Sequence, residues 1–307
     1  MKKILITGVG GFIGRNAARH FSQEGHHVYG IDAIPEESTP LHDLHAYYRL
    51  RLPSEQLDTV INEISPDACI HCAGRASVAL SVSDPLADFE AGPALTWRLL
   101  NTLRLRAPAC RTVFLSSAAI YGTPSVLPIS ESTRPAPISP YGYHKWISEM
   151  VCEEFASLYE MPIASVRIFS AYGPGLRRQV IWDLFRQAFT QNSISAQGTG
   201  NESRDFVHVV DICEALSIVL EQGQLKGEAY NLGSGVETSI AKLTSLVSSS
   251  TNKEIKISFS GHVPAGTPLN WRADMAQLSN LGFRPSITIE DGIHSFAKWC
   301  SAELGIQ

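Results

Sequence analysis

Positive charge is not in excess in this 307-residue sequence, where 25 lysines and arginines stand against 30 aspartates and glutamates, a net charge of −5. Proteins that bind the phosphate backbone of nucleic acids usually carry a basic surplus, so we expect no nucleic-acid partner. No apolar run approaches the roughly 18 residues that a membrane-spanning helix needs, so we expect no membrane segment. Glycines interrupt the N-terminal stretch MKKILITGVGGFIG and no small-residue cleavage site follows, so we expect a cytoplasmic protein without a signal peptide.

Cysteine is sparse, and its pattern indicates neither disulfides nor a metal. Without a secretion signal, the six cysteines are expected to be buried free thiols. Cys69 and Cys72 form a Cys-x-x-Cys pair, but the apolar residues around them predict a short buried strand rather than a redox turn. His71 is expected to pack or hydrogen-bond locally. The ten histidines show no metal-ligand spacing beside a carboxylate cluster, so we predict no metal site.

Hydrophobic residues make up 44% of the chain, enough to bury a large core. Through about residue 170, short apolar runs alternate with amphipathic helical segments. Strands are predicted at residues 3–7, 27–31, 68–72, 111–116 and 162–169, and helices at residues 13–23, 54–64, 85–105 and 141–159. This alternation predicts an α/β fold with a Rossmann-type, doubly wound parallel sheet, whose ligands lie beyond the carboxyl ends of the strands.

A glycine-rich turn joins the first predicted strand to the first helix. Gly8, Gly11 and Gly14 allow a phosphate to approach main-chain N–H groups at a helix N-terminus, where the helix dipole favours anions. Asp32 ends the second predicted strand, where a carboxylate can accept a hydrogen bond from an adenosine ribose 2′-hydroxyl. Because that carboxylate would repel a 2′-phosphate and no arginine follows it, the sequence predicts NAD rather than NADP.

After residue 170 the pattern becomes less regular. Glycine and proline cluster near residues 172–175 and 261–268, and helices are predicted at residues 180–191, 240–249 and 289–300. We therefore expect residues 1–170 to form an NAD-binding Rossmann domain, to which residues 204–235 return. Residues 171–307 are expected to form a smaller, mixed α/β domain that binds the substrate.

A serine, a tyrosine and a lysine have the arrangement that hydride-transfer chemistry needs. Tyr141 and Lys145 share one face of a predicted helix, because residues four apart are neighbours on its surface. A nearby ammonium stabilises phenolate, so we expect Lys145 to lower the pKa of Tyr141. Such a tyrosine accepts a hydroxyl proton while hydride leaves the same carbon. A serine ending the strand at 111–116 can bind the same oxygen.

These motifs together resemble those of the extended short-chain dehydrogenase/reductase family. The resemblance covers nearly the whole chain and points to the nucleotide-sugar epimerase/dehydratase branch. The segments that carry it, in chain order, are TGVGGFIG, HCAG, SSAAIYG, SPYGYHK, RIFSAYGPG, RDFVHVVD and YNLGSG.

The resemblance implies a role for each residue of the predicted site. Ser117, Tyr141 and Lys145 would form the catalytic triad, with Tyr141 as acid/base, Lys145 also binding the nicotinamide ribose and Ser117 holding the sugar oxygen. Phe12, Ile13 and Ala73 would join the glycines and Asp32 in binding NAD. The implied substrate is a nucleotide-diphosphate sugar.

The substrate residues depart from the family pattern. Arg204 matches an arginine that contacts the nucleotide diphosphate in relatives, while Ser170 stands where an asparagine is usual. A second diphosphate arginine is missing or shifted, and Arg272 is its candidate replacement. Arg177 and Arg178 follow the glycine–proline loop and either face the same anion or are exposed loop arginines.

Two alanines bear on the type of sugar chemistry. Dehydratases of the branch carry acidic residues directly after the motif serine, and this chain has Ala118 and Ala119, which cannot donate a proton. We therefore expect a nucleotide-sugar 4-epimerase, which oxidises C4 and returns the hydride to the other face. A nucleotide-4-keto-sugar reductase or an atypical dehydratase is the alternative. A non-catalytic NAD-binding regulator is opposed by the intact triad.

Family members often dimerise through the helices predicted here at 85–105 and 141–159, so a homodimer is expected. Apolar residues on these helices could supply the contact, although burial inside one subunit explains them equally well. The candidates are Leu99, Leu100, Leu103, Met150, Val151 and Phe155.

Overall fold

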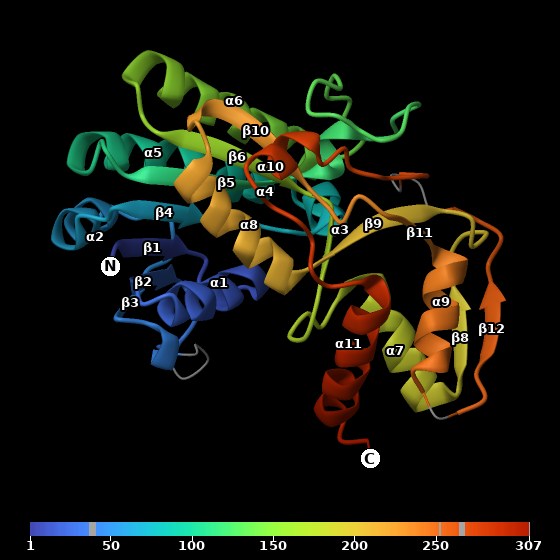
Figure 1. Cartoon of the computed structure of the whole chain (residues 1–307). Helices are drawn as coiled ribbons and strands as arrows, with labels where there is room; N and C mark the ends of the chain where they lie inside the picture. The colour runs from blue at the N-terminus through green and yellow to red at the C-terminus, as the bar shows by residue number, and fades with distance from the viewer. Residues whose placement is uncertain (37–40, 252, 264–267, 307) are drawn as a thin grey trace.

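A computed structural model describes residues 1–36, 41–251, 253–263 and 268–306. Figure 1 shows a large lobe built on a central sheet and a smaller lobe that contains α7, α9, α11, β8 and β12. Within the described residues, no helix is both long and apolar enough to cross a membrane.

The large lobe contains a seven-stranded sheet with the strand order β10-β6-β5-β4-β1-β2-β3, and every neighbouring pair is parallel. The strand order reverses between β1 and β4, so the loops that follow these strands diverge and leave a crevice at their carboxyl ends. This sheet confirms the predicted Rossmann-type fold class. The strands are β1 Lys3–Thr7, β2 His27–Asp32, β3 Ala46–Arg49, β4 Ala68–His71, β5 Arg111–Ser117, β6 Ile163–Ile168 and β10 Lys226–Leu232.

Helices cover both faces of the sheet because successive side chains of a strand point to opposite faces. In β1, Ile4 and Ile6 join the core beneath α1 and α8, whereas Leu5 joins the core beneath α2, α5 and α6. The buried face of each helix repeats at helical spacing. The helices of this lobe are α1 Phe12–Gln23, α2 Leu57–Ile64, α3 Val78–Ser83, α6 Pro140–Tyr159, α8 Val209–Gln222 and α10 Ala276–Asn280, with short 3₁₀ turns at η2 Leu41–Asp43 and η4 Ala118–Tyr121.

The long helix predicted at 85–105 is interrupted by a wider turn. It runs as α4 Pro85–Phe89, a π-helical segment η3 Glu90–Ala94, and α5 Leu95–Arg106. Pro93 lies inside the π segment. A proline cannot donate an N–H and its ring crowds the preceding turn, so the wider turn accommodates it without ending the helix.

The smaller lobe has short strands and an aromatic core. A three-stranded sheet pairs β9 Ser203–His208 with β7 Ser170–Tyr172 in parallel and with β11 Glu237–Ser239 in antiparallel fashion, and β8 Ser193–Ala196 pairs with β12 Lys256–Phe259. Stacked rings of Phe185 and Phe296 join α7 Gln179–Gln191 to α11 Ile289–Glu303, and α9 Ile240–Ser249 packs beside them. Within segment 204–235, β9 belongs to this sheet, whereas β10 lies beside β6 in the large one.

Candidate active site

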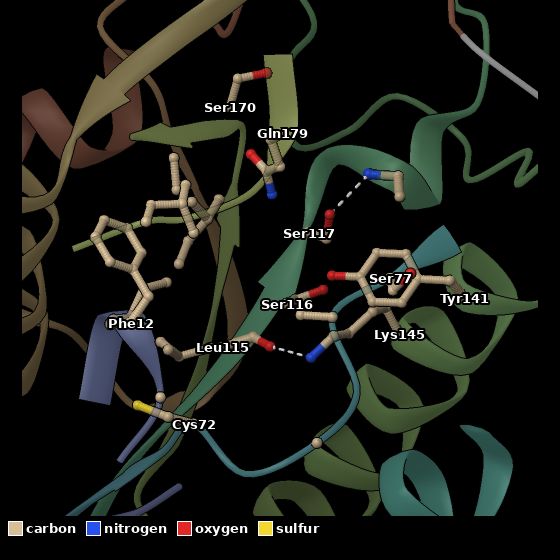
Figure 2. Close-up of a pocket in the computed structure, with 18 of the residues that line it drawn as sticks. Phe12, Cys72, Ser77, Leu115, Ser116, Ser117, Tyr141, Lys145, Ser170 and Gln179 are labelled. Atoms are coloured by element: carbon tan, nitrogen blue, oxygen red, sulfur yellow. Dashed lines mark hydrogen bonds between the residues drawn. The ribbon is translucent and has the colours of Figure 1, made fainter. Parts of the chain in front are cut away.

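A cavity of about 530 Å³ lies at the carboxyl ends of the central strands, between the two lobes. Its lining comes from the glycine turn, the end of β5, the start of α6 and the segment that enters α7. Ser117, Tyr141 and Lys145 all line it, as do Gly8, Gly11, Phe12, Ile13, Gly14 and Ser170. Figure 2 shows the Tyr141 ring beside Ser116 and Ser117, with Lys145 close to the end of β5.

The glycine turn has the geometry of a phosphate cradle. Gly8 has a left-handed φ of 70°, and a Cβ on Gly14 would lie 2.2 Å from the Gly8 carbonyl oxygen, so neither position accepts a side chain. Gly11 caps α1 without a side-chain hydrogen bond, which leaves first-turn N–H groups for an anion. The Ala73 backbone packs against Gly8, and the Ala73 N–H donates to Thr7 Oγ1 at 3.3 Å. Ala73 is thus beside the turn and is not among the lining residues.

Asp32 ends β2 directly behind the glycine turn. One carboxylate oxygen accepts from the Gly10 N–H at 2.9 Å, and the other accepts from the Ala33 N–H at 2.7 Å. The oxygen that binds Ala33 also accepts from the Ile34 N–H at 3.3 Å. These bonds fix the carboxylate against the loop, and the oxygen that binds Gly10 keeps a further lone pair for a ribose hydroxyl. The cradle and this carboxylate fit a dinucleotide that carries a free 2′-hydroxyl.

The catalytic candidates are held by short-range features. Ser117 Oγ accepts from the Ala119 N–H at 3.2 Å, which caps the turn η4. Lys145 Nζ donates to the Leu115 carbonyl at 2.7 Å. A Cβ on Gly142 would lie 2.6 Å from the Ala119 carbonyl oxygen, so a glycine there lets α6 approach η4 closely. The close approach brings Tyr141, the neighbour of Gly142, to the side of Ser117.

The charge state of the site differs from the expectation in one respect. Burial raises the pKa of Tyr141, although hydrogen bonding to Ser117 and the charge of Arg178 both act to lower it. The predicted lowering by Lys145 is therefore wrong, because loss of solvent dominates. Burial also lowers the pKa of Lys145 to about 8, against the opposing effect of acidic groups that include Asp88 and Glu149.

A buried ion pair, which the sequence reasoning missed, anchors the tyrosine helix to the sheet. Arg167 of β6 binds Glu149 of α6 with a nitrogen–oxygen distance of 2.8 Å. Its guanidinium also donates to the Tyr121 hydroxyl at 2.7 Å, and that hydroxyl donates to Asn231 Oδ1 at 2.8 Å. An arginine inside an apolar strand and a glutamate one turn beyond Lys145 are the sequence signals that could have revealed the pair.

His71 behaves as expected. Its ring nitrogens hydrogen-bond to Thr7 Oγ1 at 2.7 Å and to Thr96 Oγ1 at 3.3 Å, which confirms a local role. Burial lowers its pKa to about 3, so the imidazole is neutral. All six cysteines are free, and Cys72 is the half-buried one that reaches the cavity. Among the residues that the structure describes, no group of acidic, histidine or cysteine side chains could hold a metal ion.

The predicted substrate residues do not all meet at this cavity. Arg204 lines a second cavity of about 460 Å³ in the smaller lobe, where it donates to the Ser203 carbonyl at 2.6 Å. Arg272 lines neither cavity, and its carbonyl accepts from the Ile129 N–H at 2.8 Å. Its neighbour Trp271 lines the first cavity instead.

The segment entering α7 supplies two lining residues to which sequence reasoning gave no firm role. Arg178 lines the cavity and donates to the Ala76 carbonyl, across the gap between the lobes. Gln179 also lines it, with a left-handed φ of 69° that is strained for a residue with a side chain. Arg177 lies outside the cavity and pairs with Glu303 at 2.7 Å. Of the two loop arginines, only Arg178 reaches the site.

Residues 4–233 match the family model described as the NAD dependent epimerase/dehydratase family. A UDP-glucose 4-epimerase of Mycolicibacterium smegmatis is 29% identical, over 95% of this chain and 96% of that protein. A UDP-glucuronate 4-epimerase of Thermodesulfobacterium geofontis is 28% identical, over 98% of this chain and 96% of its own length. The structure of the UDP-glucuronic acid 4-epimerase from Bacillus cereus, in complex with UDP-glucuronic acid and NAD, superposes with a TM-score of 0.89 at 25% identity, covering 98% of this chain and 99% of the other.

The protein belongs to the NAD-dependent epimerase/dehydratase family, within the extended short-chain dehydrogenases/reductases. It is an enzyme of that family, and NAD is its cofactor. The glycine cradle, the uncapped start of α1 and the fixed carboxylate of Asp32 fit that cofactor in this chain's own geometry.

Replacing Asp32 with alanine is expected to weaken NAD binding about 10- to 100-fold, because a charge-assisted hydrogen bond to the ribose is lost. The preference for NAD over NADP should fall as well. Isothermal titration with each dinucleotide measures both effects. Glu36→Ala, which removes an exposed charge four residues along the chain, is the matched control. An unchanged cofactor preference in Asp32→Ala would refute the assignment.

Proposed function

We propose that the protein is an NAD-dependent nucleotide-sugar 4-epimerase in which Tyr141 is the acid/base. The observation that carries this proposal is the convergence of Ser117, Tyr141 and Lys145 on the cavity that also contains the cofactor cradle. The relatives named above are UDP-sugar 4-epimerases, which supports a substrate of the same class.

Each residue of the triad has a distinct task in this proposal. Tyr141 acts from its phenolate form: it takes the proton of the sugar 4-hydroxyl as C4 is oxidised, and as the phenol it returns that proton after the keto sugar has rotated. Ser117 donates a hydrogen bond to the same oxygen and keeps it beside the phenol. Lys145, held by the Leu115 carbonyl, supplies positive charge near the ring, with its Nζ 5.9 Å from the centroid. The glycine cradle and Asp32 would hold NAD, which would supply the acceptor for the C4 hydride and the donor for its return to the same carbon.

The lining favours epimerisation over dehydration. Elimination of water requires an acid near the leaving hydroxyl. Ala118 is buried, Ala119 lines the cavity, and none of the described lining residues is an aspartate or glutamate. A nucleotide-4-keto-sugar reductase would use the same triad, but it would consume an external reductant, commonly NADPH, which the carboxylate of Asp32 disfavours.

We further propose that the nucleotide extends from the first cavity into the second. Helix α7 connects them, because Arg178 and Gln179 line the first and Val180 lines the second. Arg204 offers the second cavity a cation that a diphosphate can bind. Burial lowers the pKa of Arg204 to about 10, so it remains charged at neutral pH.

Tyr141→Phe removes the proton acceptor and is expected to lower kcat for 4-epimerisation by about 10²- to 10⁴-fold. The Kd values for NAD and for UDP-sugars should stay within about threefold, because the ring is retained. Tyr159→Phe, at an exposed position at the end of the same helix, is the matched control and should keep normal turnover. Full activity in Tyr141→Phe would contradict the proposed role.

We also propose that two copies of the chain pair through α4, α5 and α6, although not through most of the residues expected. Leu99, Leu100, Leu103 and Phe155 are buried inside the subunit. The same helices instead expose other large apolar side chains, and burying them against a second copy removes that surface from water. The exposed set is Leu86, Phe89, Trp97, Tyr143 and Met150.

A charge placed on this helical face is expected to dissociate the dimer. Met150→Glu would bury an unpaired carboxylate at the contact, so its mass by light scattering should be that of a monomer while the native chain gives twice that value. Val236→Glu, at an exposed apolar position in the smaller lobe, should remain dimeric. A monomeric native chain would refute the proposed dimer.

A further inference from the structure

The cavity that contains Tyr141 is lined by cations without compensating anions. Among the described lining residues, Lys145 and Arg178 are the only side chains with a formal charge. The neighbouring carboxylates are engaged elsewhere. Asp88 binds His144 Nδ1 at 2.6 Å, and Asp32 is held by the glycine-turn amides. A ligand for this cavity therefore meets a positive field that favours negative charge.

The two cations differ in how far their hydrogen-bonding capacity is used. Lys145 is largely removed from water and binds the Leu115 carbonyl, and its task is the one given to it in the proposed triad. Arg178 is exposed at the edge of the cavity, and one of its guanidinium N–H groups donates to the Ala76 carbonyl. A guanidinium has five N–H donors, which leaves a fork free for a carboxylate. Arg178 is therefore the cation available to a substrate.

Arg178 stands at the sugar end of the cavity rather than at the cofactor end. Its partner Ala76 lies in the loop just before α3, and Ser81 of α3 accepts from the Tyr141 N–H at 3.0 Å. Arg178 and Tyr141 are thus both joined to the same short segment. Gln179 follows Arg178, and in the view of Figure 2 Gln179 and Ser170 lie on the far side of Ser117 from Lys145. Polar donors thus surround the end of the cavity into which the reacting sugar would project.

The shape of a hexopyranose connects this position to a particular substituent. C1, which carries the diphosphate, lies across the ring from C4. C5, which carries C6, is bonded directly to C4. When the 4-hydroxyl meets Tyr141, C6 therefore projects into the same end of the cavity that Tyr141 and Arg178 line, whereas the diphosphate projects away toward the second cavity and Arg204.

We propose that the sugar of the substrate is a hexuronate and that Arg178 binds its C6 carboxylate. This inference rests on the proposed epimerase function and adds the chemical class of the sugar. The relatives include 4-epimerases named for both a neutral UDP-hexose and a UDP-hexuronate, so their names do not choose between the two. Arg178 and the absence of acidic side chains among the described lining residues favour the anionic sugar.

The test compares UDP-glucuronate with UDP-glucose on the NAD-loaded protein, by equilibrium binding and by 4-epimerisation kinetics. The native chain should favour UDP-glucuronate in both Kd and kcat/KM by about 10- to 100-fold, the range for a charge-assisted bidentate bond. Arg178→Met should remove that preference and change UDP-glucose binding less than about threefold. Arg177→Met, whose side chain pairs with Glu303 outside the cavity, should leave both substrates unaffected.

Three results would overturn the inference. A native chain that binds UDP-glucose as tightly as UDP-glucuronate has no hexuronate site, even if it is an epimerase. An equal loss for UDP-glucuronate, UDP-glucose and UDP itself in Arg178→Met would place the arginine on the diphosphate instead. Failure of the native chain to bind either sugar nucleotide would remove the proposed function together with the inference. Preferential binding of UDP-glucuronate without turnover would support the hexuronate site and refute only the epimerase activity.

Discussion

The ion pair between Arg167 and Glu149 is the contact on which the geometry of the site depends. Both side chains are buried, and a buried charge without its partner is strongly destabilising. The pair fixes α6 against β6 one turn beyond Lys145, while the Arg167–Tyr121 bond holds the turn η4 in place. Tyr141, Lys145 and Ser117 therefore share one rigid frame, although they come from two segments separated in sequence.

The triad residues and the glycine turn lie at the same edge of the sheet because all of its strands are parallel. All seven strands end at the same edge, so the glycine turn after β1 and the serines of β5 face one crevice. On one side of the crevice Gly14 lets α1 approach the backbone of Gly8, and on the other side Gly142 lets α6 approach the backbone of Ala119. A hydride acceptor, a proton acceptor and a sugar C4 need to be within contact of one another, and this arrangement supplies that proximity.

Local patterns predicted the first half of the fold well. The bounds of β1 agree with the sequence, and α1 begins one residue before the predicted start, because apolar periodicity and the glycine turn mark both elements. The edge strand β3 and the π segment around Pro93 were missed. The strand β3 has a weak apolar pattern, and a proline in a helical segment does not by itself say whether the helix ends, kinks or widens. The sequence does not show contacts between distant segments. The positions of Arg204 and Arg272, away from the cavity that Tyr141 lines, were therefore not predicted.

The direction of the Tyr141 pKa shift could not be predicted from the sequence either, because it depends on how much water the fold removes from the ring. Arg178 was visible in the sequence, but its place in the cavity that Tyr141 lines follows from the path of the segment that enters α7. The glycine turn, Asp32 and the pairing of Tyr141 with Lys145 came from spacing, and the choice of Ser117 and the triad roles came from the family resemblance. The residues that would set sugar specificity required the three-dimensional structure.

The central claim is that hydride leaves and returns to the same carbon without an outside reductant. UDP-sugars deuterated at C4 test it directly when incubated with the NAD-loaded protein and analysed by nuclear magnetic resonance. A 4-epimerase yields the C4 epimer with the deuterium still on C4. Turnover that needs added NADPH, or a product that lacks the C4 deuterium, would contradict the claim.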